Sequence, residues 1–200
     1  MTVSEIPFAA IDFESAGVGK GATDVPVQIG IAWMGGGVMG ESFESFLGTD
    51  QPITWSAQKV HGIRSDDLKG APTLPALWPK IKALMEGRWI VAHGAATEKR
   101  FLRVFPFHGF GPWIDTLKLA RAAWPERESY SLGDLVISLG LEGEVRALRE
   151  NFRWHDALSD SLASLVLLRQ IITETGVGAE DAGILHRADD SIHHRLRARR

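Results

Sequence analysis

The segment at residues 7–13 constrains the fold most, because every residue in it except Asp12 is apolar. A short, almost uninterrupted apolar run is typical of a strand that is covered on both faces of a sheet. Apolar residues then alternate with period two over 26–33, and glycines at 35–37 predict a turn into another strand over 41–46. The three segments predict an antiparallel meander whose first strand is central.

Helices alternate with short strands after this meander. The spacing of apolar residues predicts helices over 74–85, 95–104, 116–123, 132–139 and 156–174, and short strands over 89–92 and 113–114. This order predicts an α/β fold with a mixed five-stranded sheet flanked by helices. The apolar pattern ends at Gly176, so we expect one domain over residues 1–176 and an Arg/His-rich C-terminal tail over 177–200.

Composition excludes several classes of protein and several chemistries. The 200 residues are 44% hydrophobic and 24% charged, which is typical of a globular domain and not of a disordered chain or a coiled coil. No run reaches the about 18 apolar residues of a membrane span, and the N-terminus lacks the layout of a signal peptide, so we expect a soluble, cytoplasmic protein with no membrane partner. The absence of cysteine leaves carboxylates and imidazoles as the available metal ligands.

The charge is distributed unevenly. The formal net charge is −3, and the last fifteen residues carry five Arg against Asp189 and Asp190, a local +3 that leaves −6 on the rest of the chain. An acidic body does not bind a polyanion through bulk charge, so a polyanionic substrate would need cations in the site itself. Metal ions could supply them.

Three short motifs favour ordinary structure over ligand binding. Gly35, Gly37 and Gly40 spell G-x-G-x-x-G, but strand-like residues follow them, which favours a hairpin over a dinucleotide site. Residues 17–21 resemble part of a phosphate-binding loop but lack its first glycine, which favours a plain loop. His193-His194 offer two imidazoles in the tail, where a solvated pair is the simpler interpretation.

Asp12 and Glu14 stand two residues apart at the end of the most apolar strand. Period two places both carboxylates on one face, within about 7 Å of each other. Two like charges in a poorly solvated place raise each other's pKa unless a divalent cation neutralises them. The simpler alternative is a strand that turns polar where it reaches the surface.

His155 and Asp160 open the last long helix. Five residues at about 100° each would put them about 140° apart on a continuous helix, so they share a site only if His155 precedes the helix. A solvated histidine beside a surface aspartate is the alternative. The apolar neighbours Ala157 and Leu158 favour a closely packed helix start.

Six segments resemble, in order, the motifs of the DEDDh 3'-5' exonucleases, the superfamily of bacterial polymerase proofreading subunits, ribonuclease T and oligoribonuclease. Residues 12–18, D-F-E-S-A-G-V, resemble the opening D-x-E-T-T-G-L. The others are V-H-G-I at 60–63, V-A-H-G-A-A-T-E-K-R-F-L at 91–102, D-T-L at 115–117, Y-S-L at 130–132 and H-D-A-L-S-D at 155–160. The resemblance spans about residues 8–172 and implies a ribonuclease H-like fold and an exonuclease domain over 1–176.

This resemblance implies a role for each matching position. Catalysis is expected to use His155 as general base and four carboxylates as metal ligands: Asp12, Glu14, Glu98 and Asp160. Substrate binding is expected at Phe13, Ser15, Trp55, His61 and His93, where Phe13, Trp55 and His61 could stack on a terminal base. Trp55 could equally belong to the core.

Glu98 departs from the family, which has an aspartate at this position. Thr97 also replaces an aromatic residue, and Gly94 replaces the asparagine after His93. Glu98 is either a ligand that reaches the metal with one more methylene or a surface residue beside two basic neighbours.

The resemblance implies a metal-dependent 3'-5' exonuclease that releases nucleoside monophosphates from single-stranded 3' ends of DNA or RNA. Two Mg²⁺ or Mn²⁺ ions suit an all-oxygen ligand set and the charge of a phosphodiester. One alternative is a catalytically weakened nucleic-acid-binding module, with Glu98 as the mark of decay. Another is a subunit associated with a polymerase, docked through the basic tail, and a homodimer is also open. The sequence leaves open the choice between DNA and RNA, because that choice depends on a contact to the 2'-OH.

Overall fold

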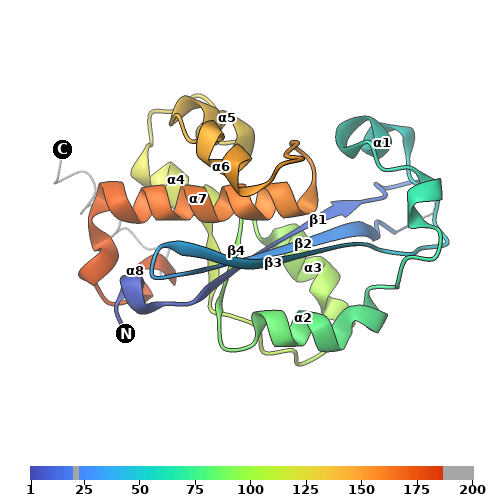
Figure 1. Ribbon diagram of the computed structural model, residues 1–200, viewed down its shortest axis with the longest axis horizontal. Coiled ribbons are helices and arrows are strands. Elements are labelled where there is room, and N and C mark those ends of the chain that lie inside the picture. The colour runs from blue at the N-terminus through green and yellow to red at the C-terminus, as the bar shows by residue number, and fades with distance from the viewer. Residues whose placement is uncertain (20–22, 187–200) are drawn as a thin grey trace.

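The computed structural model describes residues 1–19 and 23–186, which form a five-stranded sheet with helices on both faces (Figure 1). The strands are β1 (Phe8–Ser15), β2 (Pro26–Gly35), β3 (Val38–Phe46), β4 (Trp89–Ala92) and β5 (Trp113–Asp115). Their order across the sheet is β3-β2-β1-β4-β5, with antiparallel pairs from β1 to β3 and parallel pairs from β1 through β4 to β5. The mixed sheet predicted from the sequence is confirmed, with β1 at its centre.

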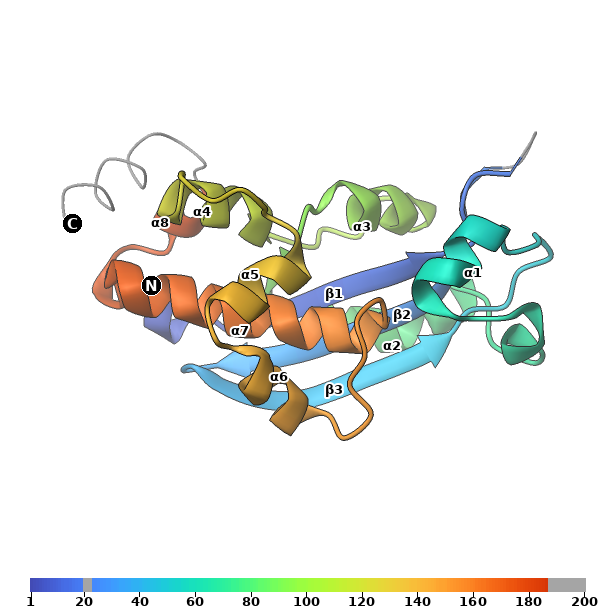
Figure 2. The ribbon, with the colours of Figure 1, turned by 90° about the horizontal axis from the view of Figure 1, so that it is seen from above.

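Helices cover the two faces unequally. They are α1 (Trp55–His61), α2 (Trp78–Met85), α3 (Ala96–Phe101), α4 (Thr116–Ala123), α5 (Leu132–Ser138), α6 (Glu142–Leu148), α7 (Ala157–Thr175) and α8 (Gly183–His186). The long helix α7 crosses one face with α4, α5 and α6 beside it, whereas α2 covers the other face (Figures 1 and 2). None of the described helices is long and apolar enough to span a membrane.

Alternation along β1 decides which face each side chain joins. Ala9, Ile11 and Phe13 belong to the core cluster that contains α2 and α3 residues. Phe8 and Ala10 belong to the other cluster, with residues of α7. Because side chains alternate along a strand, Asp12 and Glu14 also face the α7 side.

Strand β2 brings α7 unusually close to the sheet at Gly30. A Cβ atom built on Gly30 would lie 2.2 Å from both the Ala157 carbonyl carbon and the Leu158 nitrogen. The Ser161 hydroxyl donates a hydrogen bond of 3.0 Å to the Gly30 carbonyl. The first turn of α7 therefore lies directly on the backbone of β2, opposite Asp12, which pairs with Gly30 in the sheet.

Besides α8, two short helices of the described chain were not predicted from the sequence. Helices α1 and α6 have seven residues each. Helix α1 begins at a cap, where Thr54 Oγ1 accepts a hydrogen bond of 3.3 Å from the Ala57 nitrogen. The predicted helices at 74–85 and 95–104 are shorter than expected, because each includes a 3₁₀ turn, at Pro75–Leu77 and Leu102–Val104.

The described part of the chain after Gly176 packs against the domain, although the sequence predicted a tail from residue 177. A 3₁₀ turn at Val177–Ala179 and helix α8 follow it, and Val177, Ala182 and Leu185 are buried. The apolar pattern missed this segment because its elements are three and four residues long. The remainder of the predicted tail, including His193-His194, lies outside the described residues.

The glycine motifs have the ordinary roles expected of them where they are described. Gly36 and Gly37 have φ angles of 57° and 78° and form the turn between β2 and β3, so the G-x-G-x-x-G sequence is a hairpin. Gly17, with φ 78°, follows β1, and its nitrogen donates a hydrogen bond of 3.0 Å to Asp24. The rest of that glycine-rich loop lies partly outside the described residues.

Candidate active site

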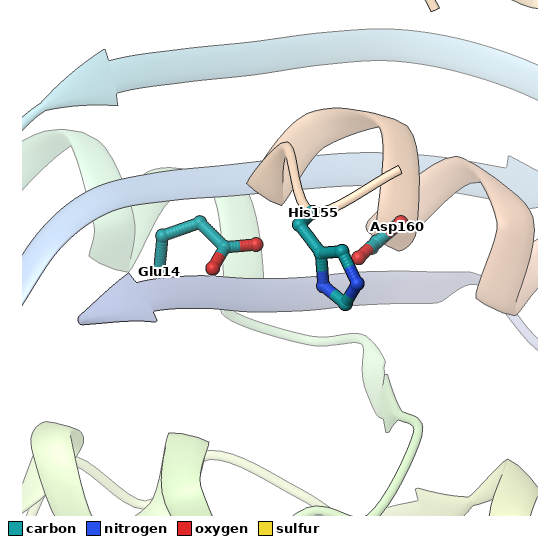
Figure 3. A group of neighbouring side chains, drawn as sticks. All are labelled: Glu14, His155 and Asp160. Carbon is teal, nitrogen blue, oxygen red and sulfur yellow. The ribbon is translucent and has the colours of Figure 1, made fainter. Parts of the chain in front are cut away.

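The carboxyl end of β1 meets the start of α7. Glu14 points from β1, Asp160 from α7 and His155 from the turn that precedes α7, and the imidazole ring lies between the two carboxylates (Figure 3). One ligand atom from each of these three side chains lies within 4.8 Å of the others. Residues separated by some 140 positions in the chain thus converge on one site.

His155 reaches this site because it is outside the helix. Its φ angle is 57°, in the left-handed region, and the next residue, Asp156, is the N-cap of α7. This reversal of the backbone directs the His155 side chain towards Glu14 and Asp160, which a position within the helix would not allow.

Glu98 approaches the cluster from α3 on the other side of β1. Its side chain is buried, with 4% of the residue exposed. A T-shaped contact between Phe101 and Phe13, with ring centroids 5.5 Å apart, holds α3 against β1. The charge of Glu98 is near enough to raise the pKa of Asp12, so Glu98 belongs to the same electrostatic cluster.

Burial raises the pKa of every carboxyl group in the cluster. Burial is the largest cause at Asp12, whose pKa lies well above its ordinary value, and the charges of Asp160, Glu98 and Glu14 add to it. Burial likewise raises the pKa values of Glu14, Glu98 and Asp160 to about 7. A bound cation would favour the ionised form of these carboxyl groups, because an opposite charge nearby lowers the pKa of a carboxyl group.

The residues present fit a divalent metal. Glu98 Oε2 and Asp160 Oδ1 are buried oxygen atoms without a hydrogen-bond partner, which is costly unless something binds them. Four carboxylates supply the oxygen ligands that Mg²⁺ and Mn²⁺ prefer. Among the described residues, the ligand atoms that come within 4.8 Å of one another belong to Glu14, His155 and Asp160, so a metal ion would fit at this end of β1.

Of the predicted substrate-binding residues, Trp55 and Ser15 reach the surface, whereas Phe13 and the two histidines pack against other segments. Trp55, at the start of α1, is 69% exposed with the Lys59 ammonium 3.9 Å from its ring centroid, so it does not belong to the core. Ser15, the last residue of β1, is partly exposed. Phe13 is only 6% exposed and packs against Phe101.

The two histidines of this set hold the backbone. His61 Nε2 lies 3.1 Å from the Ser15 carbonyl, and its Nδ1 accepts a hydrogen bond of 3.0 Å from the Ile63 nitrogen. His93 bonds to the Thr116 hydroxyl at 3.0 Å and to the Tyr130 carbonyl at 2.8 Å. Burial is the largest cause that lowers the pKa of each, and it favours the neutral imidazole.

Sequence reasoning missed Arg153 and Asp156. The Arg153 charge counteracts the rise in the pKa of Glu14, and its Nη1 would lie 3.8 Å from a Cβ on Gly62, at the end of α1. Asp156 is buried beside His155 and its pKa is lowered. Their only signal in the sequence is their place within three residues of His155.

Comparison with known proteins identifies the class. The profile of the RNase_T exonuclease family matches residues 9–168. The chain is similar to the DNA polymerase III PolC-type of Thermotoga maritima, at 27% identity over 96% of this chain and 14% of that protein. It is also similar to a DNA polymerase III subunit epsilon-like protein of Rhodobacter capsulatus, at 28% identity over 81% of this chain and 23% of that protein.

Solved structures agree on the fold. Exonuclease X in complex with 5' overhanging duplex DNA matches with a TM-score of 0.73 and 26% identity, over 90% of this chain and 99% of that one. The nuclease domain of 3'hExo, a DEDDh family member bound to rAMP, matches with a TM-score of 0.69 and 15% identity, over 90% and 98% of the two chains.

The family profile, together with the ribonuclease H-like fold and the carboxylates at the end of β1, places this chain in the DEDDh 3'-5' exonuclease superfamily. This chain belongs to the RNase_T exonuclease family, whose profile matches most of its length. It spans less than a quarter of the length of the curated polymerase relatives described above.

Proposed function

We propose that this protein removes nucleoside monophosphates from single-stranded 3' ends of DNA or RNA with the help of two Mg²⁺ or Mn²⁺ ions. The observation that carries the proposal is the cluster of four carboxylates at the end of β1, two of which have a buried oxygen without a hydrogen-bond partner. Such a cluster repels a phosphodiester on its own. It therefore supports a function in which bound cations accompany the substrate.

The ions, when bound, would supply the positive field that lets a negatively charged phosphodiester and an attacking water approach each other. Asp12, Glu14, Glu98 and Asp160 would hold them. His155 lies beside Glu14 and Asp160 with its side chain exposed, so it can take a proton from the attacking water. An imidazole suits this role because its ordinary pKa is near neutrality.

Substrate binding is proposed to use the surface around the end of β1. Trp55 offers an exposed ring for stacking, and Ser15 lies at the end of the strand. Phe13, His61 and His93 would support substrate binding indirectly, because they hold the backbone segments and the helix α3 that surround the site. Arg153 offers a half-exposed cation to a phosphate near the carboxylates.

A digestion panel tests this proposal. Labelled single-stranded DNA, duplex DNA and single-stranded RNA are incubated with Mg²⁺, with excess EDTA, and with a blocked 3' end. The proposal expects mononucleotides from free single-stranded 3' ends in Mg²⁺ alone. Hydrolysis that persists in EDTA, or equal digestion of blocked ends, would contradict it.

A second function rests on Glu98, which stands where the family has aspartate. We propose as an alternative a nucleic-acid-binding module with weakened catalysis. If Glu98→Asp raises activity well above that of the natural chain, the glutamate is an impairment and the alternative gains. If that change lowers activity, the exonuclease function stands.

A polymerase partner is a further proposal, supported by the similarity to DNA polymerase III proteins. The basic residues near the C-terminus are the proposed docking segment. Size-exclusion chromatography coupled to light scattering, with and without a polymerase subunit, distinguishes a complex, a homodimer and a monomer.

A further inference from the structure

Asp156 follows His155 directly, and the structure surrounds its carboxylate with donors. The residue is 2% exposed. Its Oδ1 accepts hydrogen bonds from the Ser159 nitrogen at 3.1 Å and the Ser159 hydroxyl at 3.0 Å, and its Oδ2 accepts one of 3.0 Å from Gln28 Nε2. Arg149 Nη2 lies 3.0 Å from Oδ1. Both oxygen atoms of Asp156 therefore have hydrogen-bond donors, in contrast to Asp160 Oδ1, which has none.

These contacts tie the start of α7 to three other elements. Gln28 on β2 donates to Asp156 and also accepts a hydrogen bond of 3.2 Å from the Ala157 nitrogen, so one amide group holds two consecutive residues. Arg149, which follows α6, also pairs with Glu44 of β3 at 2.8 Å. The residue after His155 is thus fixed by β2, by β3 and by its own helix.

His155 needs such an anchor because its backbone is strained. A residue other than glycine in the left-handed region costs on the order of 1–3 kcal/mol and keeps that conformation only when its surroundings impose it. His155 has φ 57°, and Asp156 returns to an extended conformation with φ −124° and ψ 121°. The backbone reverses at His155, and the hydrogen bonds of Asp156 fix the chain directly after this reversal.

The neighbouring charges keep Asp156 ionised. Burial alone would raise its pKa, but the hydrogen bonds from Gln28 and Ser159 and the charge of Arg149 hold the pKa below its ordinary value. An ionised carboxylate accepts stronger hydrogen bonds than a neutral one, which makes the anchor firm.

We propose that Asp156 is a positioning residue, which holds His155 in its reversed conformation and aims the imidazole at the space between Glu14 and Asp160. This inference rests on the proposed role of His155 as general base. Asp156 is not one of the expected metal ligands, although its charge raises the pKa of Glu14. The effect on the reaction that we propose for it passes through His155.

A double-mutant cycle on single-stranded DNA in Mg²⁺ separates this role from ordinary helix capping. His155→Ala should lower kcat about 10²–10⁴-fold, and Asp156→Ala should lower kcat about 10–100-fold, with KM little changed. The double variant should be no slower than His155→Ala, because an absent base cannot be misaligned. If Asp156→Ala lowers kcat by the same factor in both backgrounds, the two residues act independently and the proposal is wrong.

A capping control accompanies the cycle. Ser131 caps α5, where its Oγ accepts a hydrogen bond of 3.2 Å from the Asp134 nitrogen. Ser131→Ala should lower the Tm as any lost cap does and leave kcat unchanged. A fall in kcat equal to that of Asp156→Ala would reduce the Asp156 effect to general destabilisation.

A readout without catalysis keeps the inference testable even if the exonuclease function fails. The ring Cε1–H resonance of His155 is assigned in the metal-free protein by its absence in His155→Ala. In Asp156→Ala this resonance should shift towards that of a free histidine, and in Ser131→Ala it should stay in place. An unshifted resonance in Asp156→Ala would overturn the positioning role, whereas loss of all hydrolysis in the natural chain would overturn only the function.

Discussion

Asp156 and Asp160 lie four residues apart at the start of α7, and the structure treats their carboxylates in opposite ways. Asp156 faces β2 and receives donors from Gln28 and Ser159, and its pKa is lowered. Asp160 faces the end of β1, its Oδ1 has no hydrogen-bond partner, and burial raises its pKa to about 7. The same residue type is thus an anchor at the N-cap of the helix and an open ligand one turn later.

This contrast teaches how to separate structural acids from functional ones. Donors that surround a carboxylate stabilise its charge and leave no room for a cation. A buried carboxylate oxygen without a donor, such as Asp160 Oδ1, is unfavourable by itself, so a cation that binds it would remove this cost. The first turn of α7 contains one of each.

The largest expected effect distinguishes the two aspartates directly. Asp160→Ala should lower Mg²⁺-dependent hydrolysis on the order of 10⁴-fold, because several kcal/mol of electrostatic stabilisation depend on the ions it would hold. Isothermal titration with Mn²⁺ should show weakened binding in Asp160→Ala and unchanged binding in Asp156→Ala. Equal Mn²⁺ affinities in the two variants would remove the distinction.

Glu98 should resemble Asp160 and not Asp156. We expect Glu98→Ala to lower activity about 10²-fold, in the range for the loss of one preorganised electrostatic group, and Lys99→Ala next to it to have little effect. Glu98→Asp should fall between the natural chain and the alanine variant, because the helix is built around the longer side chain. Steady-state rates at a fixed Mg²⁺ concentration measure all three. Unchanged activity in Glu98→Ala would reduce the site to the carboxylates of β1 and α7.

The sequence predicted the sheet but only part of this contrast. Period two was enough to place Asp12 and Glu14 on one face, and five-residue spacing was enough to require His155 to precede the helix. The partners of Asp156 were out of reach, because Gln28 and Arg149 meet it only through tertiary packing and carry no local signal. Helix α1 was also missed, because most of its residues, including Trp55 and Val60, are exposed and give no buried apolar stripe.

The stability of the metal-free protein should depend on pH through the buried carboxyl groups of Glu14 and Asp160. The pKa values of Glu14 and Asp160 are about 7 in the folded protein, against 4.5 and 3.8 ordinarily, so the folded form holds protons that the unfolded chain has lost. That stabilisation is complete below the ordinary values and disappears as the pH rises through about 7. The Tm in EDTA should therefore fall by several degrees between about pH 5 and pH 8, as measured by differential scanning calorimetry.

Metal and a neutral side chain should both reverse this loss. Mn²⁺ should raise the Tm more at the higher pH, where the carboxylates are ionised. Asp160→Asn should flatten the pH dependence and raise the metal-free Tm at the higher pH. A Tm in EDTA that rises steadily over this range would show that the cluster is not strained by its charges.

The smallest expected effect concerns Arg153, whose charge acts both on Asp156 and on the carboxylate of Glu14. Its Nε is 3.7 Å from Asp156 Oδ2, and its charge also acts on Glu14. Arg153→Gln should raise KM for single-stranded DNA several-fold and reduce the slope of log KM against log salt by about 0.7, as expected for one lost phosphate contact. Arg146→Gln on α6, where Arg146 pairs with Glu142, is the matched control. An unchanged slope would assign Arg153 to the anchor alone.

Gly30 carries no functional group, yet it has consequences for how mutational data on this protein should be interpreted. Any side chain there would meet the backbone of Ala157 and Leu158 at 2.2 Å and push the start of α7 away from the sheet. That displacement would move His155 and Asp160 together. In a saturation screen scored by activity, Gly30 would therefore rank among the chemically essential positions, although it contributes only the space that a side chain would otherwise fill.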